Sequence, residues 1–254
     1  KTAYEIRPRD WSSDVCSSDL LLELGFFIES ANEARSVLDK SPKDAESLRT
    51  YALAIFRQYQ AGQLKNEKLG EIGLIDALVV ARDANPTDID LPSVLAIAYR
   101  IPELATTDMA QFSKQTIADR ANAIVDQMVA DNPTNFKAYL SRYSYRTMFG
   151  VKGADEDLEQ ALRIAPDDLA TLSTAASAAQ RSAERMRALD KKSEAAVEEY
   201  QKALGFLRKI VDLNLAPQDP GPTIAIGTIL VALGLQDRKS TRLNSSHVAL
   251  SRMP

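Results

Sequence analysis

Residues 154–179 read ADEDLEQALRIAPDDLATLSTAASAA, and this stretch decides how the rest of the chain is interpreted. Leu158 and Ala161 lie three residues apart, on one face of a predicted helix. Pro166 ends that helix, because proline lacks the N–H that a helix needs and disfavours helix in the residue before it. Asp168 can start the next helix by accepting a backbone N–H bond at its N-terminus. The stretch therefore predicts two helices joined by a tight proline turn.

The same junction, a proline followed two residues later by Asp or Asn, recurs along the chain. It occurs at Pro42 and Asp44, Pro86 and Asp88, Pro133 and Asn135, Pro166 and Asp168, and Pro217 and Asp219. The interval from Pro133 to Pro166 is 33 residues, and the other intervals run from 44 to 51 residues. Small residues recur at matching places beside the junctions, among them Ala52, Ala96, Ala161 and Ala176. Such self-similarity indicates a repeat architecture, in which small residues let paired helices approach closely.

This pattern resembles the tetratricopeptide repeat, a helix-turn-helix unit of 34 residues. The resemblance covers nearly all of residues 21–236 and implies an all-α fold, a right-handed α-solenoid of antiparallel helix pairs. The sequence places about ten helices, at residues 22–40, 45–61, 66–84, 89–100, 109–131, 136–149, 154–164, 168–186, 190–214 and 221–235. No segment shows strand alternation bounded by hairpin signals.

The two ends of the chain differ from this repeat region. The single Cys, His and Trp of the chain lie near the termini, as Cys16, His247 and Trp11. Residues 10–20 and 237–247 back-translate in one frame to the two strands of a common short-read sequencing adapter. We therefore expect the ends to be adapter-derived and to pack on nothing. The predicted division is an adapter-derived tail at 1–20, a native tetratricopeptide-like region at 21–236 that is an internal fragment, and a second adapter-derived tail at 237–254.

Composition narrows the classes of function. The chain has 254 residues with 31 Lys and Arg against 35 Asp and Glu, a net charge of −4, which argues against a dedicated nucleic-acid binder. Residues 21–236 contain no His and no Cys, so neither a His-based triad nor a thiol nucleophile is available. The acidic run at 155–159 lies in the first turn of a predicted helix, where carboxylates favour the helix dipole. We therefore predict no enzyme activity, no cofactor, no metal site and no nucleic-acid partner.

A membrane segment is not predicted either. The apolar run from Thr223 to Leu235 is too short to establish a membrane span, and it matches the pattern of a buried repeat helix. The sequence makes no prediction about localisation.

An asymmetry of charge suggests a binding face. By the resemblance, the first helix of each pair lines the concave face of the solenoid. The predicted first helices carry an excess of basic residues: Arg49, Arg57, Arg100, Lys137, Arg142, Arg146 and Arg181 against Glu46 and Asp90. A mildly basic groove suits an acidic partner, because the arginine fork can hold a carboxylate bidentately. The alternative is that these arginines only solvate the surface.

The predicted partner-binding residues are Arg49, Leu53, Arg57, Ile97, Arg100, Tyr145 and Arg146. Leu53, Ile97 and Tyr145 are the expected apolar contacts, with Tyr145 taken as a surface aromatic. The predicted function is a non-enzymatic scaffold that binds a protein, peptide or partner helix on the concave face. The alternative is the repeat or regulatory region of a larger enzyme whose catalytic domain lies outside this sequence.

Overall fold

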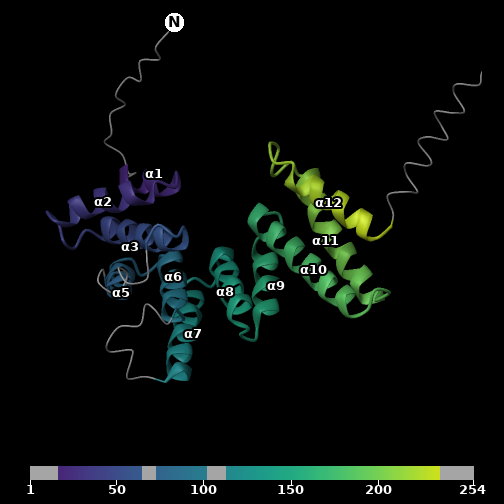
Figure 1. Ribbon diagram of the computed structural model, residues 1–254, viewed down its shortest axis with the longest axis horizontal. Helices are drawn as coiled ribbons and strands as arrows, with labels where there is room; N and C mark the ends of the chain where they lie inside the picture. Colours follow the sequence, from purple (N-terminus) through teal and green to yellow (C-terminus); the bar gives the residue numbers. More distant parts are fainter. Residues whose placement is uncertain (1–16, 65–72, 102–112, 235–254) are drawn as a thin grey trace, which may run out of the picture. The chain divides into compact units, whose positions relative to one another are not determined.

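The computed structural model describes residues 17–64, 73–101 and 113–234, and all regular secondary structure in these ranges is helical (Figure 1). The eleven helices of these ranges are α1 (Ser17–Glu23), α2 (Phe27–Leu38), α3 (Ala45–Gln60), α5 (Leu74–Ala84), α6 (Asp90–Tyr99), α7 (Lys114–Asp131), α8 (Phe136–Phe149), α9 (Ala154–Ile164), α10 (Leu169–Leu189), α11 (Glu194–Asp212) and α12 (Gly221–Ala232). The all-α prediction is confirmed. Residues 66–72 and 109–112 of the predicted helices lie outside the described ranges.

The chain forms two compact units that divide after Pro133. The first unit contains α1 to α7, and the second contains α8 to α12 (Figure 1). Within each unit, helices that follow one another along the chain pack together as hairpins, such as α2 with α3 and α6 with α7 in the first unit. The pairs α8 with α9 and α10 with α11 form the second unit, and α12 packs on α11.

Every predicted proline junction has the same hydrogen bond. The Asp or Asn two residues after the proline accepts a backbone N–H near the start of the next helix, as a helix N-terminus requires. The acceptor and donor residues, with their distances, are Asp44 and Ser47 (2.9 Å), Asp88 and Leu91 (2.7 Å), Asn135 and Lys137 (3.1 Å), Asp168 and Thr171 (3.0 Å), and Asp219 and Gly221 (2.8 Å). Asp44, Asn135 and Asp168 are the N-cap residues of α3, α8 and α10, as predicted, whereas the N-caps of α6 and α12 are Ile89 and Pro220, one residue after the predicted Asp88 and Asp219.

Two junctions also satisfy the end of the preceding helix. Asn85 and Asn132 stand directly before the prolines, and their side-chain amides donate to the carbonyls of Ala81 at 2.9 Å and Met128 at 3.0 Å. These carbonyls belong to the last turns of α5 and α7, where helix carbonyls lack a partner within the helix. The Asn-Pro pair therefore completes one helix as the following Asp or Asn starts the next.

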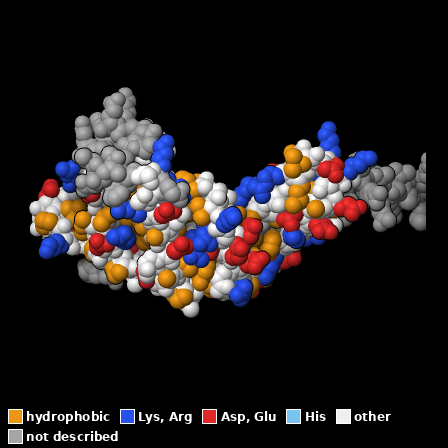
Figure 2. Space-filling model, turned by 90° about the horizontal axis from the view of Figure 1, so that it is seen from below, with side chains coloured by type: hydrophobic (Ala, Val, Ile, Leu, Met, Phe, Trp, Pro, Cys, Tyr) orange, Lys and Arg blue, Asp and Glu red, His pale blue; other side chains and the backbone are white. Residues whose placement is uncertain are grey.

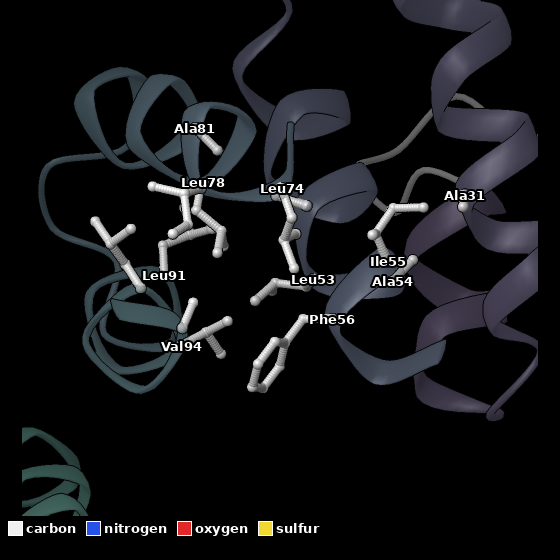
Figure 3. Close-up of a cluster of buried hydrophobic side chains, with 14 residues drawn as sticks. Ala31, Leu53, Ala54, Ile55, Phe56, Leu74, Leu78, Ala81, Leu91 and Val94 are labelled. Carbon is white, nitrogen blue, oxygen red and sulfur yellow. The ribbon is translucent and has the colours of Figure 1, made fainter. Parts of the chain in front are cut away.

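Alanine side chains set the close contacts between helices. Ala52, Ala96 and Ala161 have no exposed surface and Ala176 is 3% exposed, as the sequence predicted for small residues at helix contacts. In the first unit Ala52 belongs to a core with larger residues from α3, α5 and α6, among them Phe56 and Leu78 (Figure 3). Since these residues are buried against neighbouring helices, no single hairpin could cover them alone.

One predicted helix is divided in two. The sequence predicted a single helix at residues 22–40, but α1 ends at Glu23 and α2 begins at Phe27. Gly25 adopts a left-handed φ of 82°, and Phe26 N donates to the carbonyl of Leu21 at 2.9 Å. This is a Schellman-type helix end, which needs a residue that tolerates positive φ. Gly25 therefore indicates the break between α1 and α2, which the hydrophobic periodicity alone does not reveal.

The expectation that residues 1–20 pack on nothing is wrong for residues 17–20. These residues form the start of α1, which packs on α2 and α3. Ser18 is fully buried and its carbonyl accepts a 2.7 Å hydrogen bond from Ser30 Oγ, while Asp19 accepts one from Thr50. Leu22, later in the same helix, packs against the core of the unit. Residues 1–16 and 235–254, with Trp11 among them, lie outside the described ranges.

We expect the N-cap at Asp44 to contribute about 1 kcal/mol to the free energy of unfolding, which Asp44→Ala removes. Hydrogen bonding to Ser47 holds the pKa of the Asp44 carboxyl below its usual value. The contribution is therefore present above the ordinary aspartate pKa of about 4 and is lost as the pH falls through the lowered value. Urea unfolding of both proteins, followed by circular dichroism from neutral to acid pH, measures it. Asp39→Ala is the control, and an equal loss there would contradict the assignment.

Candidate partner-binding grooves

The first unit brings three of the predicted site residues together. Arg49, Leu53 and Arg57 line one groove of about 540 Å³ with residues of α1 and α2, and we call it the α3 groove. The groove also contains Asp19, Glu23 and Asp90. Its charges are therefore mixed, and the expected excess of basic residues is not present there.

Arg49 is held by carboxylates of its own chain. Its Nε lies 2.6 Å from Asp88 Oδ2, its Nη2 lies 3.0 Å from Asp90 Oδ2 and its Nη1 lies 3.9 Å from Asp19 Oδ1. Burial of the guanidinium lowers its pKa, but the hydrogen bond to Asp88 and the three nearby charges outweigh burial and raise the pKa. A partner carboxylate at Arg49 would have to displace these contacts. Arg49 therefore has a structural role, because its ion pairs connect α3 to the junction before α6.

The remaining predicted residues of the first unit are also engaged within the chain. Arg57 donates to Gln60 Oε1 at 3.0 Å, and Arg100 Nη2 donates to Asn122 Oδ1 on α7 at 3.0 Å. Ile97 is half-buried and packs against the core of the unit. Neither Ile97 nor Arg100 lines the α3 groove. The predicted set is thus not a single site.

The prediction that Tyr145 lies on the surface is wrong. Tyr145 is 1% exposed, and its ring packs against Phe149 with centroids 4.9 Å apart. Tyr143, on the same helix, is 5% exposed. Residues two apart are separated by about 200° around a helix, so α8 is covered on opposite sides. A single apolar stripe, which the sequence analysis assumed, does not describe a helix that is buried on both sides.

Arg146 belongs to a buried ionic cluster. The carboxylate of Asp157 on α9 is 2% exposed and accepts hydrogen bonds from Arg142 Nη2 at 2.6 Å and Arg146 Nη1 at 2.9 Å. Arg146 Nη1 also donates to the carbonyl of Gly153 at 2.9 Å, in the turn between the two helices. The sequence pattern predicted only that Asp157, in the first turn of a helix, favours the helix dipole. The position of Asp157 next to Leu158, on the buried face of α9, was the feature of the sequence that could have indicated its burial.

Asp157→Asn should destabilise the chain by about 3 kcal/mol, because it leaves two partly buried guanidinium groups without their shared counter-charge. Thermal and urea unfolding of the two proteins measure the effect. Glu156→Gln, a change at an exposed carboxylate one residue away, serves as the control and should leave stability within about 0.5 kcal/mol of the original. Equal stabilities for the Asp157 and Glu156 variants would show that the cluster is not structural.

Gly153→Ala should destabilise the chain by about 2 kcal/mol, since Gly153 has a φ of 90° and an added Cβ would meet Arg146 Nη1 at 2.7 Å. Gly205→Ala in α11 is the matched control, because a Cβ there meets nothing within 4 Å. That change should stabilise the chain by about 0.5–1 kcal/mol, as expected for alanine in a helix interior. Chemical unfolding measures both, and the same sign for both changes would refute the argument.

A larger groove lies within the second unit, and we call it the α9–α10 groove. Its volume is about 660 Å³, and Phe206 of α11 completes its lining. From α9 it takes Leu158 and Leu162, and from α10 it takes Ala175 and Ala178, which lie at the spacings of one helix face. These residues form one apolar cluster. The groove therefore has an apolar floor in which Leu162, Ala178 and Phe206 are partly exposed, beside the buried Leu158 and Ala175.

The two helices give the groove walls of opposite charge. Asp155 and Glu159 lie four residues apart on α9, and Arg181 and Arg185 lie four residues apart on α10. Arg181 Nη2 donates to the Tyr143 hydroxyl at 3.2 Å, and none of the four charged groups has an ion-pair partner within the part of the chain that the structure describes.

The other charged residues of the lining are Lys152, Arg146, Glu199 and Lys202. Glu199 and Lys202 pair with each other on α11, and the hydrogen bond to Glu199 raises the pKa of the Lys202 ammonium. Arg146 is held by Asp157, and Lys152 stands in the turn before α9. Beyond the groove, acidic and basic side chains are interspersed over the surface (Figure 2). The free charge of the groove therefore comes mainly from its two walls.

The described ranges contain neither a metal site nor a membrane span. No group of three or more His, Cys, Asp or Glu there is placed to hold a metal ion. Among the helices of these ranges, none combines the length and the apolar character needed to cross a membrane.

Comparison with known proteins identifies the fold. No family model and no curated protein matches the chain. TTC0263, a tetratricopeptide-repeat protein of Thermus thermophilus, has a similar structure with a TM-score of 0.53 and 18% identity, over 85% of this chain and 96% of that protein. Human IFIT1, solved as a dimer with m7Gppp-AAAA, is similar with a TM-score of 0.56 and 13% identity, over 94% of this chain and 51% of IFIT1. The chain thus has a tetratricopeptide-like α-solenoid fold and spans about half the length of IFIT1.

The likeness to IFIT1 corrects the prediction about partners. The sequence analysis excluded nucleic acid from the near balance of charge, yet a protein of this fold is solved with m7Gppp-AAAA. The exclusion was wrong, because net charge averages over the whole surface, whereas a binding groove presents only its own side chains. The excess of arginine on the predicted first helices does not identify an acidic partner either, since Arg49 and Arg146 are paired within the chain.

Proposed function

We propose that this chain is a non-enzymatic scaffold that binds a partner protein in the α9–α10 groove. The observation that carries the proposal is the partly exposed apolar floor of Leu162, Ala178 and Phe206, bordered by charged walls without ion-pair partners in the described ranges. An apolar centre with a polar rim is the usual composition of a protein-binding surface. The tetratricopeptide-like fold supports the same class of function.

The composition of the groove favours a protein over a polyanion. A phosphate backbone gains its affinity from Lys and Arg and is repelled by carboxylates. Here Asp155 and Glu159 stand free on α9, opposite the basic wall of α10. A protein segment can present both charges together with apolar side chains, and so it can match floor and walls at once.

The proposed binding function is also compatible with a region that regulates a larger enzyme. A groove that holds a partner segment can serve an intermolecular partner or a domain of the same protein. No nucleophile and base are brought together in the groove, whose titratable side chains are carboxylates, Lys, Arg and Tyr143. We therefore assign no reaction to the α9–α10 groove.

Site-specific cross-linking tests this function. A photo-crosslinking amino acid in place of Ser182, which lines the groove, should yield protein adducts in an extract of the source organism. The matched control replaces Glu184, which is exposed and lies about 200° around α10 from Ser182. We expect protease-sensitive adducts at Ser182 at least tenfold more abundant than at Glu184.

Two results would contradict the proposal. Nuclease-sensitive adducts at Ser182 would assign the groove to a nucleic acid, and equal adducts at both positions would mean that the groove is not the binding surface. Circular dichroism of both variants shows whether the helical content is retained.

A further inference from the structure

We infer that the α9–α10 groove recognises an amphipathic α-helix whose two flanks carry opposite charge, basic toward α9 and acidic toward α10. The inference rests on the proposed function and specifies the partner of the same groove. It follows from the backbone of the walls, the shape of the floor and the placement of the four free charges.

The backbone of the groove excludes strand pairing. The apolar floor and the charged walls lie in α9, α10 and α11, where backbone N–H and C=O groups bond within each helix, and the rest of the lining comes from α8 and the turn at 150–152. An extended peptide gains affinity by pairing its own backbone with a free sheet edge, which these walls do not offer. Above an apolar floor its N–H and C=O groups would lose water without gaining partners. A helix satisfies its backbone internally and does not carry this cost.

The floor fits the apolar stripe of a helix. Leu158 and Leu162 are one turn apart on α9, and Ala175 and Ala178 are one turn apart on α10. Because the alanine side chains are small, a partner helix can approach α10 closely. Since α9 has 11 residues, it spans about 16 Å, which corresponds to about three turns of a partner. Three or four apolar side chains at i, i+3 or i+4, and i+7 would cover this length.

The walls determine the charges on the flanks of that helix. Asp155 and Glu159 present two negative charges one turn apart, and Arg181 and Arg185 present two positive charges one turn apart. A uniformly acidic helix would be repelled along α9, and a uniformly basic helix along α10. Lys152 lies at the turn before α9, so the negative wall is confined to the helix itself. Opposite flanks satisfy both walls and also fix the direction in which the partner lies.

Three synthetic helical peptides test this inference on the full chain. All share one stripe of leucines at helical spacing and differ only in their flanks, which are Lys on one side and Glu on the other, Glu on both, or Lys on both. We expect the split-charge peptide to bind at least tenfold more tightly than either uniform peptide, as measured by fluorescence anisotropy at low salt. Amide shifts should change around Leu158, Ala178 and Phe206. A nitroxide at the peptide N-terminus should broaden opposite ends of the groove when the two flanks are exchanged.

Charge reversal of one wall gives the matching test on the protein. R181E/R185E makes both walls acidic and should shift the preference at least tenfold toward the peptide with Lys on both flanks. R163E/R208E, at two exposed arginines outside the groove, is the control and should keep the preference for the split-charge peptide. Circular dichroism confirms that the variants remain helical. Because the readout is a change of preference and not a loss of binding, a partly unfolded variant cannot produce it.

The outcomes separate this inference from the function on which it rests. Equal binding of the three peptides would overturn the charge assignment. Tighter binding of a proline-containing, non-helical peptide of the same composition would overturn the helix and leave the groove as a protein-binding site. If cross-linking at Ser182 captures a protein but no helical peptide perturbs the groove, the inference fails and the proposed function stands. If neither experiment finds the groove occupied, both fail.

Discussion

The hydrogen bond between the side chain after each proline and the backbone of the next helix is the interaction on which the rest of the structure depends. At α3, α8 and α10 it fixes the residue at which the helix begins, and therefore which side chains face the preceding helix. At the junction before α10, Asp168 accepts the N–H of Thr171, and Leu172 and Ala176 then enter the core one turn apart. A helix that started one residue later would rotate these side chains by about 100°. The cap thus sets the rotation of the helix that places the small residues at the helix contacts.

Close helix contacts also explain why the arginines are occupied. Alanines with no exposed surface let neighbouring helices approach, which brings charged side chains on facing helices within reach of each other. Arg142 and Arg146 meet Asp157 in this way, and Arg49 on α3 meets Asp88 in the turn before α6. Because a buried carboxylate without its partners would be costly, such pairs favour one register of the two helices over others. The sequence does contain an excess of arginine on these helices, but Arg49, Arg142 and Arg146 form ion pairs within the chain.

Sequence predicted what depends on neighbours along the chain, and it failed where a side chain depends on a helix from elsewhere. Proline stops, alanine positions and N-caps are local features, and the predicted caps were found at Asp44, Asn135 and Asp168. The burial of Tyr145 and the pairing of Arg146 depend on the faces that surround α8, which periodicity within one helix does not report. The α9–α10 groove was missed for the same reason. Gly25 is different, since its effect is local and a glycine within a predicted helix was a usable signal.

The groove arises where the chain departs from a regular repeat. The pair α8 and α9 has helices of 14 and 11 residues, whereas α10 and α11 have 21 and 19. Since α10 is about 32 Å long and α9 only about 16 Å, the shorter helix cannot cover the longer one along its whole length. Arg181 and Arg185 lie in the later half of α10. The irregular spacing of the prolines, which weakened the match to an ideal repeat, thus marks the segment in which charged and apolar side chains remain free for a partner.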